Sequence, residues 1–155
     1  MRQIITKFIE VEEIAALTYE EFARNGSCDP NLERVWQEMA KDEHDHAMQL
    51  KFALRLPFYQ TFDGFSDRCP NPEEAKCFVD AAYNKALLGT QTPQEMLDAA
   101  LEIENRLLKI HAVYVLLFKE PELLKLFKSL ARADEIHVQR LEDFARSYRE
   151  RHSAG

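Results

Sequence analysis

Glycine, an excess of basic over acidic residues, and paired cysteines are lacking in this sequence, and each lack argues against a class of protein. Only four glycines occur in 155 residues, and most of the six prolines separate long periodic stretches, which favours few, long elements. The net charge of −7 argues against a general nucleic-acid-binding protein, because binding phosphates requires a basic face. No apolar run approaches a membrane span, and the first residues become acidic too early for a signal peptide. We expect a single cytoplasmic domain over residues 1–155, with neither nucleic acid nor membrane as a partner.

The cysteines are too few and too scattered to form a framework. Cys28, Cys69 and Cys77 are odd in number and contain no C-x-x-C pair. A disulfide scaffold, a zinc ribbon or a rubredoxin-type iron site needs such pairs. We therefore favour three reduced thiols, and a contact between Cys69 and Cys77 stays open.

Four long helical patterns fill most of the chain. They cover about Gln3 to Arg24, Pro30 to just before Pro57, Pro93 to about Lys119, and about Pro121 to about Arg149. Asp29 is a helix-capping residue directly before a proline, and Thr92 with Glu95 forms a capping box. Each long pattern therefore has a recognisable beginning.

The connection over residues 57–92 is too long for a simple turn. It contains a shorter helical pattern that begins at Asn71 and ends at Gly89. Simple up-and-down bundles use short loops throughout, whereas a bundle with one long crossover has the ferritin-like topology. The predicted fold is all-α: a ferritin-like four-helix bundle whose one long crossover contains a short extra helix.

Apolar residues at steps of three and four place one core-facing stripe on each long helix. Each stripe is apolar except near its middle, where every helix carries a carboxylate and two helices add a histidine three residues later. These residues are Glu12, Glu43, His46, Glu104, Asp134 and His137.

This polar centre predicts a pair of bound cations. Carboxylates that converge in a low-dielectric core lose several kcal/mol of solvation each and repel one another, and divalent ions relieve both costs. Glu43 and His46 lie one helical turn apart, so both can bind one ion, and Asp134 with His137 repeats this spacing. Di-iron and di-manganese bundles use such a ligand set. We expect two metal ions, with Fe favoured and Mn or Zn as alternatives.

The two halves of the chain repeat this pattern. Glu12 precedes Glu43 by 31 residues, and Glu104 precedes Asp134 by 30. Tyr19 follows Glu12 by seven residues, as His111 follows Glu104. Two helix pairs with matching ligand positions would form a pseudo-two-fold site for two metals.

Three segments resemble the corresponding helices of rubrerythrins: residues 12–23, AKDEHDHA at 40–47, and SLARADEIHVQRLEDFAR at 129–146. The resemblance covers all four long helices and implies a ferritin-like fold in which the six residues named above bind the metals. It also implies peroxide or O2 chemistry at iron, an external electron donor (rubredoxin-like or other), and a homodimer. The chain resembles a rubrerythrin without the rubredoxin domain.

Two positions depart from the rubrerythrin pattern. Asp134 stands where the family usually has glutamate, and Leu107 replaces a second glutamate that acts there as an extra ligand. Two functions therefore stay open. One is a di-iron oxidoreductase of peroxidase or ferroxidase type. The other is a non-catalytic metal-binding or iron-handling bundle with Zn, Mn or Fe.

Three further residues are candidates for a supporting role around the ligands. His111 is favoured as a hydrogen-bonding core residue over an added ligand. Tyr19 and Tyr114 either donate hydrogen bonds to ligand carboxylates or simply pack in the core. Three other polar residues of the second helix are assigned to its exposed face: Asp42, His44 and Asp45.

Overall fold

The computed structural model describes residues 1–25, 29–57 and 70–153, and these contain five α-helices and no strand. The helices are α1 (Arg2–Asn25), α2 (Pro30–Ala53), α3 (Pro72–Leu87), α4 (Pro93–Leu117) and α5 (Pro121–Ser153). The prediction of an all-helical chain is confirmed. The long helices begin and end close to their predicted bounds, and α5 continues past Arg149 to Ser153.

Side-chain caps explain why α2, α3 and α4 begin where they do. Asp29 Oδ1 accepts a hydrogen bond from the backbone N–H of Asn31 at 2.9 Å. Asn71 Oδ1 accepts one from the backbone N–H of Glu73 at 3.0 Å. Thr92 and Glu95 form the predicted capping box, each side chain accepting from the other's backbone N–H. Each of the three helices has proline in its first turn, where the missing N–H costs nothing.

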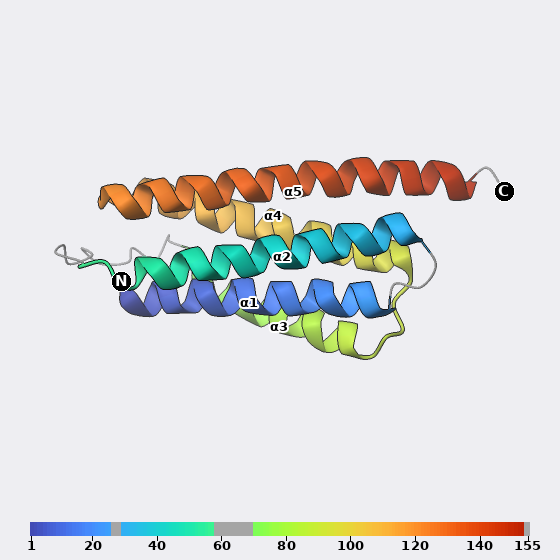
Figure 1. Ribbon diagram of the computed structural model, residues 1–155, viewed down its shortest axis with the longest axis horizontal. Coiled ribbons are helices and arrows are strands. Elements are labelled where there is room, and N and C mark those ends of the chain that lie inside the picture. Colours follow the sequence, from blue (N-terminus) through green and yellow to red (C-terminus); the bar gives the residue numbers. More distant parts are fainter. Residues whose placement is uncertain (26–28, 58–69, 154–155) are drawn as a thin grey trace.

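The helices pack as two antiparallel hairpin-like pairs with a fifth helix beside them. Helix α1 packs most extensively against α2, and α4 against α5; contacts of α2 with α5 and of α1 with α4 join the pairs. Figure 1 shows these four long helices lying along the long axis of the molecule, with α3 alongside α1. None of the helices in the described residues combines the length and apolar character needed to cross a membrane.

A glycine turn connects α3 to the segment before α4. Gly89 has a φ of +63°, a left-handed conformation that side chains disfavour, and its amide bonds the Ala86 carbonyl at 3.0 Å. A Cβ at this position would lie 3.2 Å from Oδ1 of Asn25, at the end of α1. The predicted end of the short helix at Gly89 is therefore confirmed, and it lies next to the end of α1.

The predicted stripes form the core. Their residues are buried, except that Phe144 and Tyr148 near the end of α5 are half-buried. Aromatic clusters lie on both sides of the polar centre. The first contains Tyr19, Phe22 and Trp36, and the second contains Phe8, Tyr114, Phe118 and Phe127. The carboxylates therefore lie in an apolar and largely dry interior.

Candidate metal centre

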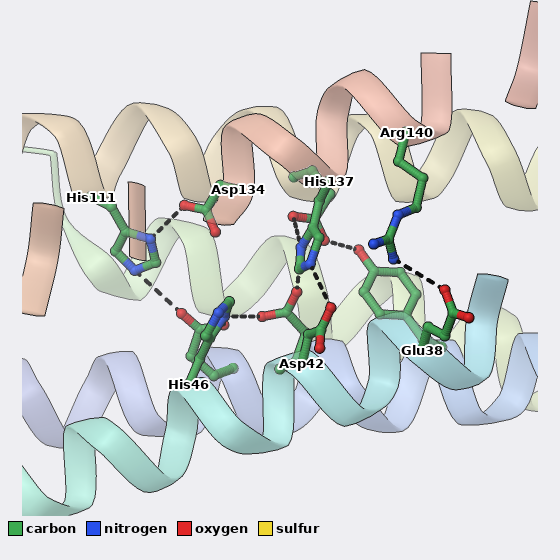
Figure 2. A network of polar contacts seen from close by, with 11 residues as sticks. Glu38, Asp42, His46, His111, Asp134, His137 and Arg140 are labelled. Carbon is green, nitrogen blue, oxygen red and sulfur yellow. Dashed lines mark hydrogen bonds and ion pairs between the residues drawn. The ribbon is translucent and has the colours of Figure 1, made fainter. Parts of the chain in front are cut away.

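The six predicted ligand residues come together in the interior, from four different helices. Helix α1 contributes one residue, α2 two, α4 one and α5 two. The four carboxylate residues have no solvent exposure, while His46 is 6% and His137 2% exposed. Figure 2 shows part of this network, with His46 and His137 facing the space between α2 and α5. Glu12, Glu43, His46, Glu104, Asp134 and His137 are thus all buried where the helical stripes meet.

Five of these residues form two groups with the spacing of metal ligands. Glu12, Glu43 and His46 form one group, and Glu43, Glu104 and His137 form the other. Within each group, one ligand atom from every residue lies within 4.8 Å of the others. Glu43 belongs to both groups, so its carboxylate is common to the two candidate ligand sets.

Both histidines direct Nδ1 toward carboxylate oxygens. His137 Nδ1 lies 3.1 Å from Glu43 Oε1 and 3.1 Å from Glu104 Oε2. His46 Nδ1 lies 2.8 Å from Glu43 Oε2. The nitrogen of each ring that faces the centre is therefore Nδ1.

Asp134 is close to the centre but is in neither ligand group. Its Oδ2 is 2.7 Å from Nδ1 of His111, and both side chains are fully buried. On the other side of the ring, His111 Nε2 lies 3.3 Å from Oε1 of Glu12. His111 therefore lies between Asp134 and Glu12 (Figure 2), as the prediction of a hydrogen-bonding core residue requires.

The two tyrosines proposed as supporting residues differ in their contacts. Tyr19 donates a hydrogen bond to Glu104 Oε1 at 2.5 Å, and its ring stacks on Trp36 with the centroids 6.0 Å apart. The hydroxyl of Tyr114 donates instead to the backbone carbonyl of Pro70 at 3.3 Å. Tyr19 thus supports a ligand carboxylate directly, whereas Tyr114 contacts the crossover segment.

The prediction that Asp42 belongs to the exposed face of α2 is only partly right. Its side chain is 38% exposed, and Oδ2 lies 3.2 Å from Nε2 of His137. Asp42 is not part of the apolar stripe on α2. The periodicity of that helix therefore could not indicate this contact, which is made with a ring from α5. A carboxylate can only accept, so Asp42 favours the proton on Nε2 and leaves Nδ1 available to a cation.

The remaining predictions concern residues outside the centre. His44 is exposed and lies 2.9 Å from Glu20, and Asp45 is exposed as well, so both belong to the surface as predicted. Cys77 is an exposed free thiol. Cys28 and Cys69 lie outside the described residues, and so does the contact of Cys69 with Cys77 that the sequence leaves open.

Burial and mutual repulsion strongly perturb the acid groups of the centre. Burial, followed by the charge of Glu43, raises the pKa of Glu12 well above its usual 4.5. The same two causes raise the pKa of Glu104 to about 7. Burial also acts on Glu43, but bonds from His137 and His46 outweigh it and lower the pKa of this shared carboxylate.

The histidine that faces two of these carboxylates also has a raised pKa. Burial lowers the pKa of His137, but its contacts with Glu104 and Glu43 outweigh this and raise it to about 11. A proton on Nδ1 therefore supplies part of the positive charge that the buried carboxylates require. That proton occupies the nitrogen which would otherwise bind a metal.

Several buried polar atoms in the centre have no hydrogen-bond partner in the protein. They are both carboxylate oxygens of Glu12, Oε1 of Glu43, Oδ1 of Asp134 and Nε2 of His111. Leaving such atoms unsatisfied costs roughly 1–3 kcal/mol each, and more when they are charged. Each of these oxygen and nitrogen atoms has a lone pair that can bind a cation, so the residues present fit divalent ions.

No family model matches this chain, and comparison with curated proteins and with solved structures finds no significant match. The residues of the centre and their geometry therefore carry the functional inference. The structure shows a buried group of carboxylates and imidazoles that could hold a metal ion.

Proposed function

We propose that this chain is a two-metal carboxylate protein, with iron as the favoured metal, that reduces peroxide or O2. The observation that carries the proposal is the shared position of Glu43. Its two oxygens face different histidines, since Oε2 contacts His46 and Oε1 contacts His137. A carboxylate placed in this way can bridge two ions.

The arrangement of the helices supports a rubrerythrin-related, ferritin-like bundle. Four long helices carry the predicted ligands, and the connection between α2 and α4 includes α3. A connection of this kind fits the one-crossover topology that ferritin-like bundles share. The resemblance of residues 12–23, 40–47 and 129–146 to rubrerythrins points to the same family.

The two histidines are the most exposed residues of the buried centre. The side chains of His46 and His137 are 8% and 3% exposed, whereas Glu12, Glu43 and Glu104 are fully buried. Their rings lie 5.9 Å apart between α2 and α5. The centre is thus nearest to solvent at these two rings, and its burial favours small reactants such as peroxide and O2 over larger organic substrates.

The chain's residues would bind and orient the ions, and the surrounding aromatic clusters would exclude bulk water. Two ferrous ions held there would supply the two electrons that, with two protons from solvent, reduce hydrogen peroxide to two water molecules, and an external donor, rubredoxin-like or other, would return those electrons. Tyr19 holds Glu104 in place through its hydroxyl. Glu104 has a pKa of about 7 in the metal-free protein, so at neutral pH it would release a proton when it binds an ion.

The decisive experiment is anaerobic loading with Fe(II) followed by peroxide, with near-ultraviolet absorbance as the readout. We expect two Fe(II) per chain to be oxidised for each peroxide consumed, faster than free Fe(II). Glu43→Ala should abolish this reaction, because it removes the residue common to both ligand groups. Oxidation at the rate of free Fe(II) would refute the proposal.

Glu135→Ala is the matched control for that experiment. Glu135 is adjacent in sequence to Asp134, but its side chain is exposed and pairs with Arg132 at 2.6 Å. Its loss removes the same charge from the protein without touching the centre. The control should therefore keep the stoichiometry and rate of the unmodified chain.

One observation favours a second candidate, a non-catalytic bundle that binds Zn, Mn or Fe. Asp134 lies in neither ligand group, and the buried Leu107 offers no ligand one turn after Glu104. A ligand set with fewer carboxylates suits Zn as well as Fe. Metal analysis of the native protein separates the candidates, since stoichiometric Zn with no Fe would favour the second.

The resemblance to rubrerythrins extends the proposal to the assembly of the protein. We include a homodimer, because that family resemblance implies one. Sedimentation or light scattering tests it directly, and a monomer at micromolar concentration would remove this part of the proposal without affecting the metal centre.

A further inference from the structure

His111 is the residue of the polar centre whose role the predicted ligand set leaves unassigned. It lies on α4, is fully buried, and its ring packs against Phe8 and Phe127 with centroids 5.2 and 5.6 Å away. Aromatic neighbours cannot satisfy two ring nitrogens. The polar atoms within reach of those nitrogens therefore decide what His111 does.

Asp134 determines which nitrogen carries the proton. Its Oδ2 lies 2.7 Å from Nδ1 and can only accept when ionised, so Nδ1 is the donor. The same relation holds at His137, where Asp42 faces Nε2 and the opposite nitrogen faces the ligand carboxylates. At His111 the nitrogen left facing the centre is Nε2.

Nε2 is aimed at a carboxylate with which it makes no hydrogen bond. It lies 3.3 Å from Glu12 Oε1, yet neither atom has a hydrogen-bond partner. A bare imidazole nitrogen and an ionised carboxylate oxygen repel each other at this distance unless a metal cation or a proton lies between them. Two ligands at roughly 2.1 Å from one ion are about 3.0 Å apart at a right angle and about 3.4 Å apart at the tetrahedral angle.

We infer that His111 is a further metal-binding residue, which binds through Nε2 the ion held by Glu12, Glu43 and His46, while Asp134 orients its ring. This inference rests on the proposed two-metal centre and adds a ligand to one of its positions. His111 and Asp134 lie outside the group of Glu12, Glu43 and His46, so the His111 ring or the Glu12 carboxylate has to shift when the ion binds. Oδ1 of Asp134 makes no hydrogen bond, because the orienting contact uses only Oδ2.

The consequence is that the two metal positions differ. The position at Glu12 has two imidazole ligands, His46 and His111, whereas the position at Glu104 has only His137. Tyr19, which matches His111 in the internal repeat, donates to Glu104 and cannot replace an imidazole as a neutral ligand. Zinc favours nitrogen ligands, so the first equivalent of Zn(II) should bind at the Glu12 position.

The test is a Zn(II) titration of the full chain labelled with 15N-histidine. Long-range 1H–15N spectra report for each ring nitrogen whether it is protonated, bare or metal-bound. We expect Nε2 of His111 to become metal-bound and Nδ1 to stay protonated, together with metal binding by His46 and His137. The exposed His44, paired with Glu20, is the internal control and should not change.

The outcomes separate this inference from the proposed function. Metal binding by His46 and His137 while His111 Nε2 carries a proton would overturn the inference and leave the metal centre intact. If none of the three rings binds Zn(II), the metal centre and the inference both fail. The titration needs no substitution at the site, so it does not depend on a variant that folds.

A matched pair of variants provides an independent readout. His111→Gln should weaken Zn(II) binding at one position by more than the roughly 10–100-fold typical of losing an outer-shell partner. His44→Gln should leave both affinities unchanged. Equal affinities in these two variants would contradict the assignment of His111 as a ligand.

Discussion

Two aspartates of α2, Asp42 and Asp45, show how a single contact separates a surface residue from a supporting one. They lie three residues apart, and neither belongs to the core-facing stripe. Asp45 is exposed, whereas Asp42 reaches Nε2 of His137 at 3.2 Å. The contact depends on where α5 places its histidine, which periodicity along α2 does not encode.

Asp42→Ala should weaken metal binding about 10–100-fold, because His137 loses the acceptor that keeps Nδ1 available. Competition with a chelator of known affinity measures this change with Zn(II) or Mn(II). Asp45→Ala removes the same charge from the same helix and is the control. Equal affinities for the two variants would show that Asp42 does not orient the ring.

Glu12→Gln should remove one metal position and stabilise the metal-free protein by about 1 kcal/mol or more at pH 8. The reason is that burial and the charge of Glu43 make an ionised Glu12 unfavourable in the absence of a cation. Urea denaturation of the metal-free protein measures the free energy of unfolding.

Glu13→Gln is the neighbouring control for this change. Glu13 is partly exposed and pairs with Lys51, so its loss should alter stability by less than about 1 kcal/mol. Strong destabilisation of the metal-free protein by Glu12→Gln would instead identify Glu12 as part of a structural network.

At the scale of the element, helix bounds follow from local chemistry. Asp29, Asn71 and Thr92 each cap a helix by accepting a backbone hydrogen bond, and each was identified from the sequence because the signal lies within four residues. Gly89 ended α3 for a similarly local reason. The end of α5 was predicted too early, since no glycine or proline follows Arg149 before Gly155.

Thr92→Ala should destabilise the protein by about 1 kcal/mol, because α4 loses one half of its capping box. In a chain of this length, that corresponds to a fall of roughly 2–4 °C in Tm. Thr90→Ala, in the exposed segment before the helix, is the control and should leave Tm unchanged. An equal effect of both variants on Tm would contradict a capping role, and metal affinity should stay the same in both.

At the scale of the whole molecule, the buried charges set the pH dependence of stability. The folded-state pKa of Glu104 is raised from 4.5 to about 7, so the folded state binds more protons than the unfolded state between these values. Stability of the metal-free protein should therefore fall as pH rises through this range, by up to about 3 kcal/mol from Glu104 alone. His137, raised from 6.5 to about 11, continues the loss at higher pH.

Glu43 has the opposite effect at the acid end, because its pKa is lowered and its contribution is lost as pH falls below 4.5. The metal-free protein should thus be most stable at weakly acidic pH, which urea denaturation from pH 4 to pH 9 measures. Metal affinity should rise with pH instead, since ligands must release their protons. A stability that does not change between pH 5 and pH 8 would contradict the shifted pKa values, and Glu104→Gln should reduce the slope.

The sequence by itself determined which residues are buried on each helix and therefore which polar residues enter the core. Steps of three and four put Glu12, Glu43, Glu104 and their partners on apolar stripes, and burying such stripes brings their polar members inside. That argument needs only helical geometry and the cost of exposing apolar surface. It explains why all six predicted ligand residues are buried.

Only the tertiary structure decided which of those residues face one another. The contacts of His111 with Asp134 and Glu12, and of Asp42 with His137, join different helices at separations from 23 to 99 residues in the sequence. Their existence depends on how α1, α2, α4 and α5 are rotated and shifted along one another. Single-helix periodicity leaves those rotations and shifts undetermined, so the partners of each ligand had to come from the packed structure.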